Sequence, residues 1–152
     1  MPVSENKGPL LKLHRENPRI PLPSYESEGA AGMDVCAFTD TDIILKPLER
    51  ALISTGLTLE IPVGYEAQVR SRSGLAIKSG LTVLNSPGTI DSDYRGIVKV
   101  IMINLGDSDA VISDGQRIAQ LVVAPVSKVY LEEAEKLSET RRGSEGFGST
   151  GK

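Results

Sequence analysis

The sequence is poor in the side chains that build most metal centres and covalent active sites. It has no tryptophan, a single cysteine (Cys36) and a single histidine (His14) among 152 residues. A lone cysteine excludes an intrachain disulfide and a cysteine-based zinc site, and a lone histidine argues against a histidine-rich metal site. Because His14 lies in a proline-flanked N-terminal segment, no Ser–His or Cys–His pair suits covalent catalysis. A hydrolytic enzyme with this composition is expected to use water as its nucleophile.

Long apolar segments and net positive charge are also missing. The longest apolar runs, such as 118–126, are far shorter than the ~20 residues of a membrane-spanning helix, and the N-terminus lacks the apolar stretch of a secretory signal. The formal net charge is −3, which disfavours a broad phosphate-neutralising face for nucleic acid. We therefore expect a cytoplasmic protein without membrane or nucleic-acid contacts, in which a few positioned arginines bind any phosphate ligand.

The dominant hydrophobic period is two, which indicates β-strands. Leu57, Leu59, Ile61 and Val63 alternate with polar or turn-forming residues, and residues 65–69 repeat the pattern. Segments 97–105 and 118–126 are nearly continuous apolar runs, typical of strands buried on both faces. Since aromatic residues make up only 4% of the chain, the core must be aliphatic. The pattern predicts an all-β fold, a jelly-roll-like barrel or sandwich.

Helix signals are few, and the C-terminal segment differs from the rest of the chain. A short helix is predicted over 73–79, capped by Ser73 and ended by Gly80, and 130–139 is a second candidate. Residues 141–152 are rich in glycine and serine, and such a segment buries too little apolar area to offset its conformational entropy. We predict one domain, with a β-barrel over 1–140 and a mobile C-terminal lid segment over 141–152.

Three motifs each allow a structural and a functional interpretation. The tail from Gly146 to Lys152 matches two glycine-rich phosphate-loop patterns, but it lacks the strand and helix that such loops require. It is either a disordered linker or a lid in which Phe147 stacks on a base. Segment 70–74 is either a solvated strand end or a phosphate site. In the predicted hairpin around 88–96, Asp91 and Asp93 are either turn residues or carboxylates that activate a Mg²⁺-associated water.

Taken together and in order, the motifs resemble those of one enzyme family. The segments AGMDVCA (31–37), RSGLA (72–76), NSPGTIDSDYRG (85–96), GQRIAQL (115–121) and RGSEGFGSTG (142–151) are similar to the five motifs of the homotrimeric dUTPases. The resemblance implies a β-rich jelly roll that hydrolyses dUTP to dUMP and pyrophosphate with Mg²⁺. Such an enzyme limits uracil incorporation into DNA and supplies dUMP for thymidylate synthesis. It also implies a homotrimer with active sites at subunit boundaries.

The resemblance assigns the nucleoside contacts to segment 85–99. Asp91 is expected to be the general base that activates water for in-line attack on the α-phosphorus. Tyr94 is expected to stack on the deoxyribose and leave no room for a ribose 2′-hydroxyl, and Lys99 lies on the strand that leaves the turn. The residues expected to read the uracil, by side chain or main chain, are Asn85, Gly88, Thr89 and Ile90.

Phosphate contacts are expected from the remaining motifs. Asp34 and Gln120 match positions near the phosphates and the water shell of Mg²⁺, with Asp34 contacting the ion through water and the phosphates holding it. Phe147 is expected to cover the uracil ring, with the tail arriving from a neighbouring chain. The other expected phosphate-binding residues are Arg72, Ser73, Gly74, Arg142, Gly148, Ser149 and Thr150.

The chain departs from the family pattern at three positions. Ser71 stands where proline is common, Ser79 where histidine is frequent, and Glu145 where glycine precedes the tail motif. Two rival functions remain at this point, a dCTP deaminase of the same fold superfamily and a non-catalytic nucleotide-binding module. The DSDYRG turn and the GFGSTG tail favour the dUTPase.

Overall fold

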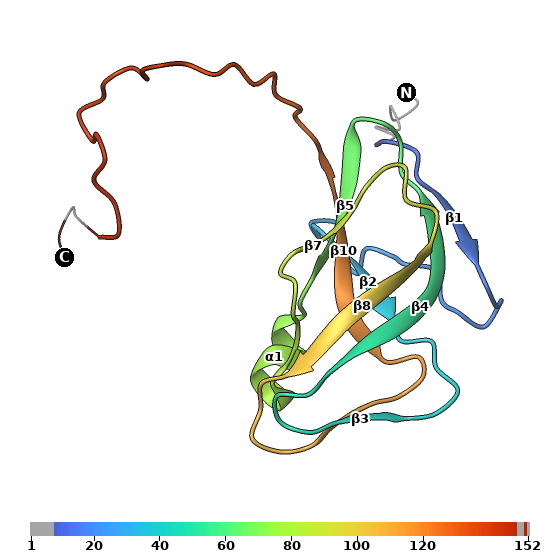
Figure 1. Cartoon of the computed structure of the whole chain (residues 1–152). Helices are drawn as coiled ribbons and strands as arrows, with labels where there is room; N and C mark the ends of the chain where they lie inside the picture. The colour runs from blue at the N-terminus through green and yellow to red at the C-terminus, as the bar shows by residue number, and fades with distance from the viewer. Residues whose placement is uncertain (1–7, 149–150, 152) are drawn as a thin grey trace.

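Antiparallel strands account for almost all regular structure in the computed structural model, which describes residues 8–148 and 151 (Figure 1). One four-stranded sheet has the order β1-β4-β8-β6, a second has the order β2-β10-β5-β7, and β3 pairs with β9. The strands are β1 Lys12–Arg15, β2 Met33–Cys36, β3 Ile43–Leu45, β4 Arg50–Glu60, β5 Tyr65–Arg70, β6 Leu81–Val83, β7 Gly88–Ile90, β8 Ile97–Asn104, β9 Ala110–Ile112 and β10 Arg117–Pro125. The predicted β-rich jelly roll is confirmed.

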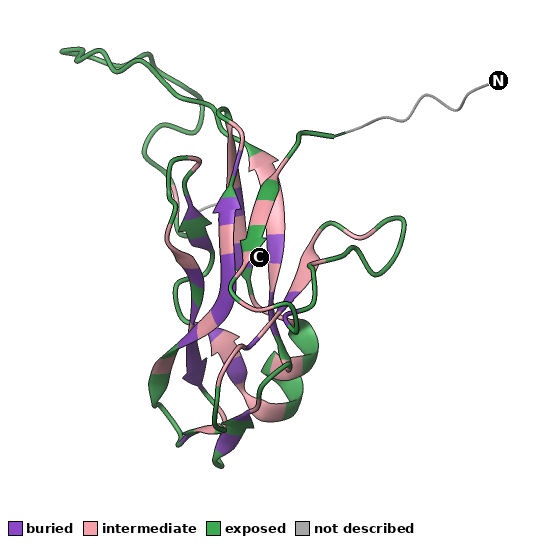
Figure 2. Ribbon diagram, turned by 90° about the vertical axis from the view of Figure 1, so that its right-hand side faces the viewer, coloured by how far each residue is buried: buried purple, intermediate pink, exposed green. Residues whose placement is uncertain are grey.

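The core lies between the two larger sheets and is aliphatic, as predicted. Ile53, Val100 and Met102 are completely buried, and Figure 2 shows buried residues along the strands. The two fully buried polar side chains among the described residues are both hydrogen-bonded. Thr55 Oγ1 donates to the Val98 carbonyl at 2.7 Å, and Asn104 Nδ2 donates to the carbonyls of residues 45 and 108. No buried side-chain polar atom among the described residues lacks a hydrogen-bond partner.

Two strand predictions need correction. β4 ends at Glu60 instead of continuing to Val63, which is 91% exposed. Pro62 has no N–H to extend the ladder, and its carbonyl instead accepts a turn hydrogen bond from the Tyr65 amide. β8 and β10 are also not buried on both faces in the single chain, because Lys99 is exposed and residues 122–124 are only partly covered. An apolar run does not distinguish a packed face from one that lines a pocket or meets another chain.

The predicted short helix is present as α1, Ser73–Ser79. Its C-terminal signal was identified correctly, since Gly80 adopts a left-handed conformation with φ of 68° and donates to the Ala76 carbonyl at 3.1 Å. The N-cap prediction was wrong: Arg72, not Ser73, occupies that position, and no side chain caps the helix. No helix in the described part of the chain is long and apolar enough to cross a membrane.

The chain after β10 forms an extended arm that leaves the barrel (Figure 1). The Val126 amide still donates to the Gly64 carbonyl at 2.8 Å, but Tyr130 and Leu137 farther along are 91% and 87% exposed. The predicted helix over 130–139 is absent. Ten residues are too few for an isolated helix, and the apolar side chains of this segment have no surface of their own chain to pack on.

Candidate functional site

A pocket of about 600 Å³ lies beside the outer face of β8. Lys99 and Ile101 line it from β8, and Leu52 lines it from the neighbouring strand β4. The structure brings six of the predicted site residues together in its lining: Asn85, Thr89, Ile90, Asp91, Tyr94 and Lys99. The lining thus combines apolar surface with an amide, a carboxylate, a phenol and an ammonium group, a mixture suited to a small polar ring with charged substituents.

The turn that carries Asp91 joins two sheets and is not the predicted hairpin. β7 pairs with β5 in one sheet, whereas β8 pairs with β4 and β6 in the other. Segment 91–96 therefore crosses from one sheet to the other. The hairpin prediction was wrong because strand partners are set by long-range pairing, which the local turn signals of Pro87 and Gly96 do not report. The crossing is what opens a pocket between the turn and β8.

The Tyr94 ring is fixed by the residues that follow it. Its hydroxyl donates to the Ile97 carbonyl at 3.1 Å, and its amide donates to the Asp91 carbonyl at 3.2 Å. A Cβ atom on Gly96 would lie 2.3 Å from Tyr94 Oη and 2.5 Å from Cζ. Gly96 therefore allows the ring to lie against the backbone, and Arg95 closes the turn by donating to the Ser92 carbonyl at 2.7 Å.

Gly96→Ala is expected to displace the Tyr94 ring, because the added methyl group occupies the same space. An off-rotamer side chain costs about 0.5–1.5 kcal/mol, so kcat/KM for a substrate bound in this pocket should fall by roughly 2- to 10-fold. Steady-state kinetics would measure the change. Gly29→Ala is the matched control, since no atom lies within 4 Å of a Cβ at that position. Equal kinetics in the two variants would show that Gly96 does not position the ring.

Ser71, one of the departures from the family pattern, has a structural role. Its hydroxyl lies 2.6 Å from Thr82 Oγ1 and accepts a hydrogen bond from the Val83 amide at 2.9 Å. These contacts fasten the end of β5 to β6. The serine therefore stabilises the segment that leads into Arg72.

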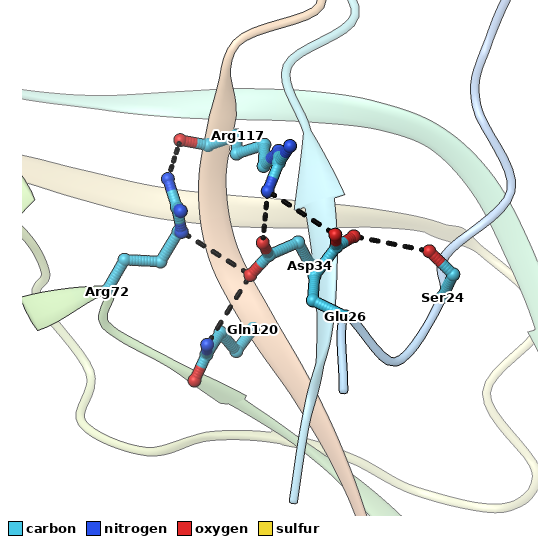
Figure 3. A network of polar contacts seen from close by, with 6 residues as sticks. All are labelled: Ser24, Glu26, Asp34, Arg72, Arg117 and Gln120. Carbon is cyan, nitrogen blue, oxygen red and sulfur yellow. Dashed lines mark hydrogen bonds and ion pairs between the residues drawn. The ribbon is translucent and has the colours of Figure 1, made fainter. Parts of the chain in front are cut away.

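A second group of polar residues surrounds Asp34 on β2 (Figure 3). The side chain of Asp34 is only 9% exposed, and one of its carboxylate oxygens lies 3.4 Å from Arg72 Nε and 3.4 Å from Gln120 Nε2. The other oxygen lies 3.2 Å from Nη1 of Arg117. The structure thus joins three predicted residues, Asp34, Arg72 and Gln120, and adds Arg117, which the sequence reasoning missed.

Cys36 lies next to this group but is not suited to nucleophilic attack. Burial raises the pKa of the Cys36 thiol, although the positive charge of Arg117 acts in the opposite direction. The thiol is therefore protonated at neutral pH, and a thiol is a much weaker nucleophile than a thiolate. This agrees with the expected use of water.

The described residues contain no cluster of three or more acidic, histidine or cysteine side chains that could hold a metal ion. Both oxygens of Asp34 already contact donors. Asp34, a single carboxylate that already contacts protein donors, fits a water-mediated contact to Mg²⁺. The phosphates of a bound molecule would hold the ion, because Mg²⁺ retains several waters and uses few protein side chains.

The pocket and the Asp34 group do not meet within one chain. The pocket lining contains none of Asp34, Arg72 or Gln120, and Ser73 and Gly74 are exposed at the start of α1. Gly88 is on β7, close enough to Asn85 that a Cβ would lie 3.2 Å from its amide nitrogen. Three tail residues, Arg142, Phe147 and Gly148, lie on the exposed arm. The predicted residues Ser149 and Thr150 lie outside the described part of the chain.

The chain is similar to known proteins in sequence and in fold. Residues 18–151 match the family model described as dUTPase. The chain is 55% identical to the deoxyuridine 5′-triphosphate nucleotidohydrolase of Hydrogenobaculum sp. (strain Y04AAS1), over 93% of this chain and 96% of that protein. It is 56% identical to the Brucella melitensis biotype 2 enzyme of the same name, over 99% of both chains. Staphylococcus bacteriophage 80alpha dUTPase with dUpNHpp superimposes with a TM-score of 0.84 at 28% identity, over 93% of this chain and 98% of that one. The chain belongs to the dUTPase family.

Proposed function

We propose that the chain hydrolyses dUTP to dUMP and pyrophosphate, and that Asp91 activates the water. Water attacks the α-phosphorus while Asp91 accepts its proton, and the bond from that phosphorus to the bridging oxygen breaks as pyrophosphate leaves. The observation that carries the proposal is the single pocket lining shared by Asn85, Asp91, Tyr94 and Lys99. This activity limits uracil incorporation into DNA and supplies dUMP for thymidylate synthesis.

The surroundings of Asp91 suit a general base. The residue is exposed and lines the pocket, and among the described residues its carboxylate takes part in no ion pair or side-chain hydrogen bond. An unpaired carboxylate can accept a proton without first breaking another contact. An exposed, unpaired carboxylate in the pocket lining therefore supports the proposed role of Asp91.

Mg²⁺ is the cofactor, and the phosphates of dUTP would hold most of its coordination shell. Asp34 would contact the water of the ion, with Gln120 beside it, which agrees with the absence of an acidic cluster among the described residues. Bound to the phosphates, the ion would offset negative charge on the leaving pyrophosphate. Arg72, with the amides of Ser73 and Gly74, would bind the phosphates directly.

A homotrimer would bring the separated parts of the site together. The nucleoside pocket and the Asp34 group are distinct surfaces of one chain, and the arm beyond Val126 carries exposed Tyr130 and Leu131. A neighbouring subunit that supplies the Asp34 group, and an arm that supplies Phe147 and Arg142, would complete each site. The mass in solution by light scattering tests this arrangement, which requires three chains per particle.

A cytoplasmic location agrees with the single unpaired cysteine.

Tyr94→Ala is expected to raise the acceptance of UTP relative to dUTP, because the ring would no longer occupy the space of a ribose 2′-hydroxyl. A steric and stacking contact of this kind contributes a free energy of about 1–3 kcal/mol. Its loss should therefore lower the dUTP/UTP ratio of kcat/KM by roughly 5- to 150-fold. Tyr94→Phe keeps the ring and should keep the preference. An unchanged ratio in the alanine variant would assign sugar selection to another residue.

The substrate itself is tested by product analysis. Purified protein is incubated with dUTP, UTP, dCTP and dTTP, with and without Mg²⁺, and pyrophosphate and ammonia are measured. We expect pyrophosphate from dUTP only, and only with Mg²⁺. Ammonia released from dCTP would instead indicate a deaminase, and no product from any nucleotide would indicate a non-catalytic binding module.

A further inference from the structure

A β-bulge sets the position of Arg117, the one residue of the Asp34 group that has no role in the function proposed above. Arg117 and Gln120 are three residues apart, a spacing that puts side chains on opposite faces of a regular strand. Gln120 pairs with Asp34, but Arg117 pairs with Cys36, so three steps along β10 match only two along β2. The extra residue sits in a register shift between positions 117 and 119. Arg117 consequently turns to the same side as Asp34 and Gln120 (Figure 3).

Arg117 holds two functional residues at once. Its guanidinium Nη1 lies 3.2 Å from Asp34 Oδ2, compared with 3.9 Å from the exposed Glu26 carboxylate, so Asp34 is its principal partner. Its main-chain carbonyl accepts a hydrogen bond from Arg72 Nη1 at 3.3 Å. The side chain of Arg117 thus contacts Asp34, and its main-chain carbonyl contacts Arg72.

The contacts that hold Arg72 are long. Its contacts, 3.4 Å to Asp34 and 3.3 Å to the carbonyl of Arg117, are longer than the 2.7–2.9 Å typical of charge-assisted hydrogen bonds, and the 3.2 Å contact of Arg117 with Asp34 is the shortest of the three. Arg72 can therefore turn to a phosphate at small cost. Asp34, whose side chain is 9% exposed, would then depend on Arg117 for a cationic partner, because a nearly buried carboxylate without one is strongly destabilised.

We propose that Arg117 is a positioning residue for triphosphate binding, which keeps Asp34 oriented while Arg72 moves to the phosphates. The inference rests on the proposed placement of Arg72 and Asp34 near the triphosphate. It assigns different roles to the two arginines. Arg72 contacts the triphosphate, and Arg117 remains paired with the Asp34 carboxylate when Arg72 moves away. The bulge in β10 is the structural feature that makes this division possible.

The test measures binding of the triphosphate separately from binding of the nucleoside. Calorimetry with dUpNHpp and with deoxyuridine is carried out on the full chain, its Arg117→Gln and Arg117→Lys variants, and the charge-matched control Lys46→Gln on the turn after β3. We expect Arg117→Gln to weaken dUpNHpp binding by about 10- to 100-fold, the range found when a residue that orients a side chain at a metal site is removed, with deoxyuridine binding unchanged. Arg117→Lys should recover part of the loss, and Lys46→Gln should bind normally.

A double-mutant cycle with Asp34→Asn then shows whether Arg117 acts through Asp34. We expect Arg117→Gln to add little loss in the Asp34→Asn background, because its partner is already neutral. Fully additive losses, or normal dUpNHpp binding by Arg117→Gln, would overturn the inference while leaving the proposed function intact. Normal dUpNHpp binding by Asp34→Asn would remove Asp34 from the proposed site and the inference with it. Equal losses of deoxyuridine and dUpNHpp affinity in Arg117→Gln would indicate general misfolding and also overturn the inference.

Discussion

Replacing Asp91 with asparagine is expected to lower kcat for dUTP by at least about 10²–10⁴-fold, the contribution of a general base. Asparagine preserves the size of the side chain, but its amide does not accept the proton of the attacking water. Since Asp91 is exposed and unpaired among the described residues, the change should leave the fold and the pocket intact. Binding of dUpNHpp should therefore remain within a few-fold of the original chain, and single-turnover kinetics would locate the loss in the chemical step.

Asp93 provides the matched control for this prediction. It lies on the same turn and is also exposed, but it does not line the pocket. Asp93→Asn removes the same charge from the same turn, so it accounts for any long-range electrostatic effect. A near-normal kcat in Asp91→Asn, or equal losses in the two variants, would exclude Asp91 as the base.

Local sequence features predicted the elements of the fold well. Alternation at Leu57 and Leu59 marks a strand with one buried face, and both residues are buried in β4. The C-terminal limit of α1 followed from Gly80, which can adopt the left-handed conformation that ends a helix. Six residues predicted from segment 85–99 line one pocket, because they are close together in the chain.

Features that depend on long-range pairing could not be predicted from the sequence. The register shift between 117 and 119 arises in the pairing of β10 with β2. From the three-residue spacing alone, Arg117 and Gln120 would lie on opposite faces of a strand. The crossing of segment 91–96 between sheets depends on which strands β7 and β8 join. The outer faces of β8 and β10 resemble buried faces in composition, and only the packed chain shows that they are open.

Deleting residues 141–152 is expected to reduce kcat/KM for dUTP by at least about 30-fold. The segment would contribute stacking by Phe147 and a charge-assisted contact by Arg142, each worth about 1–3 kcal/mol, and 2 kcal/mol corresponds to roughly 30-fold. Ordering the arm costs conformational entropy, so losing either contact should shift the arm toward the open state. Arg142→Gln should reproduce part of the loss, and Arg141→Gln, which changes the adjacent charge, should not.

The same deletion should leave the thermal midpoint almost unchanged. The described hydrogen bonds of the arm beyond residue 139 are internal to it, such as those from the Glu145 amide to the Arg142 carbonyl and from Arg142 Nε to the Glu145 carbonyl. The Phe147 side chain is fully exposed. Removal of the segment therefore takes no described contact from the barrel, and a large drop in the midpoint would mean that it stabilises the fold instead of closing the site.

Mixing two inactive variants distinguishes a tail that closes its own site from one that closes a neighbour's. Asp91→Asn chains retain an intact tail, and chains lacking 141–152 retain an intact Asp91. If the tail reaches another subunit, co-refolded mixed trimers contain sites with both parts, and activity should rise well above that of either variant alone. If each tail serves the pocket of its own chain, no mixed particle contains a complete site and activity stays at the level of the parents. The arm leaves the barrel after Val126 (Figure 1), and its exposed Tyr130 and Leu131 need a surface that its own chain does not offer, so we expect complementation.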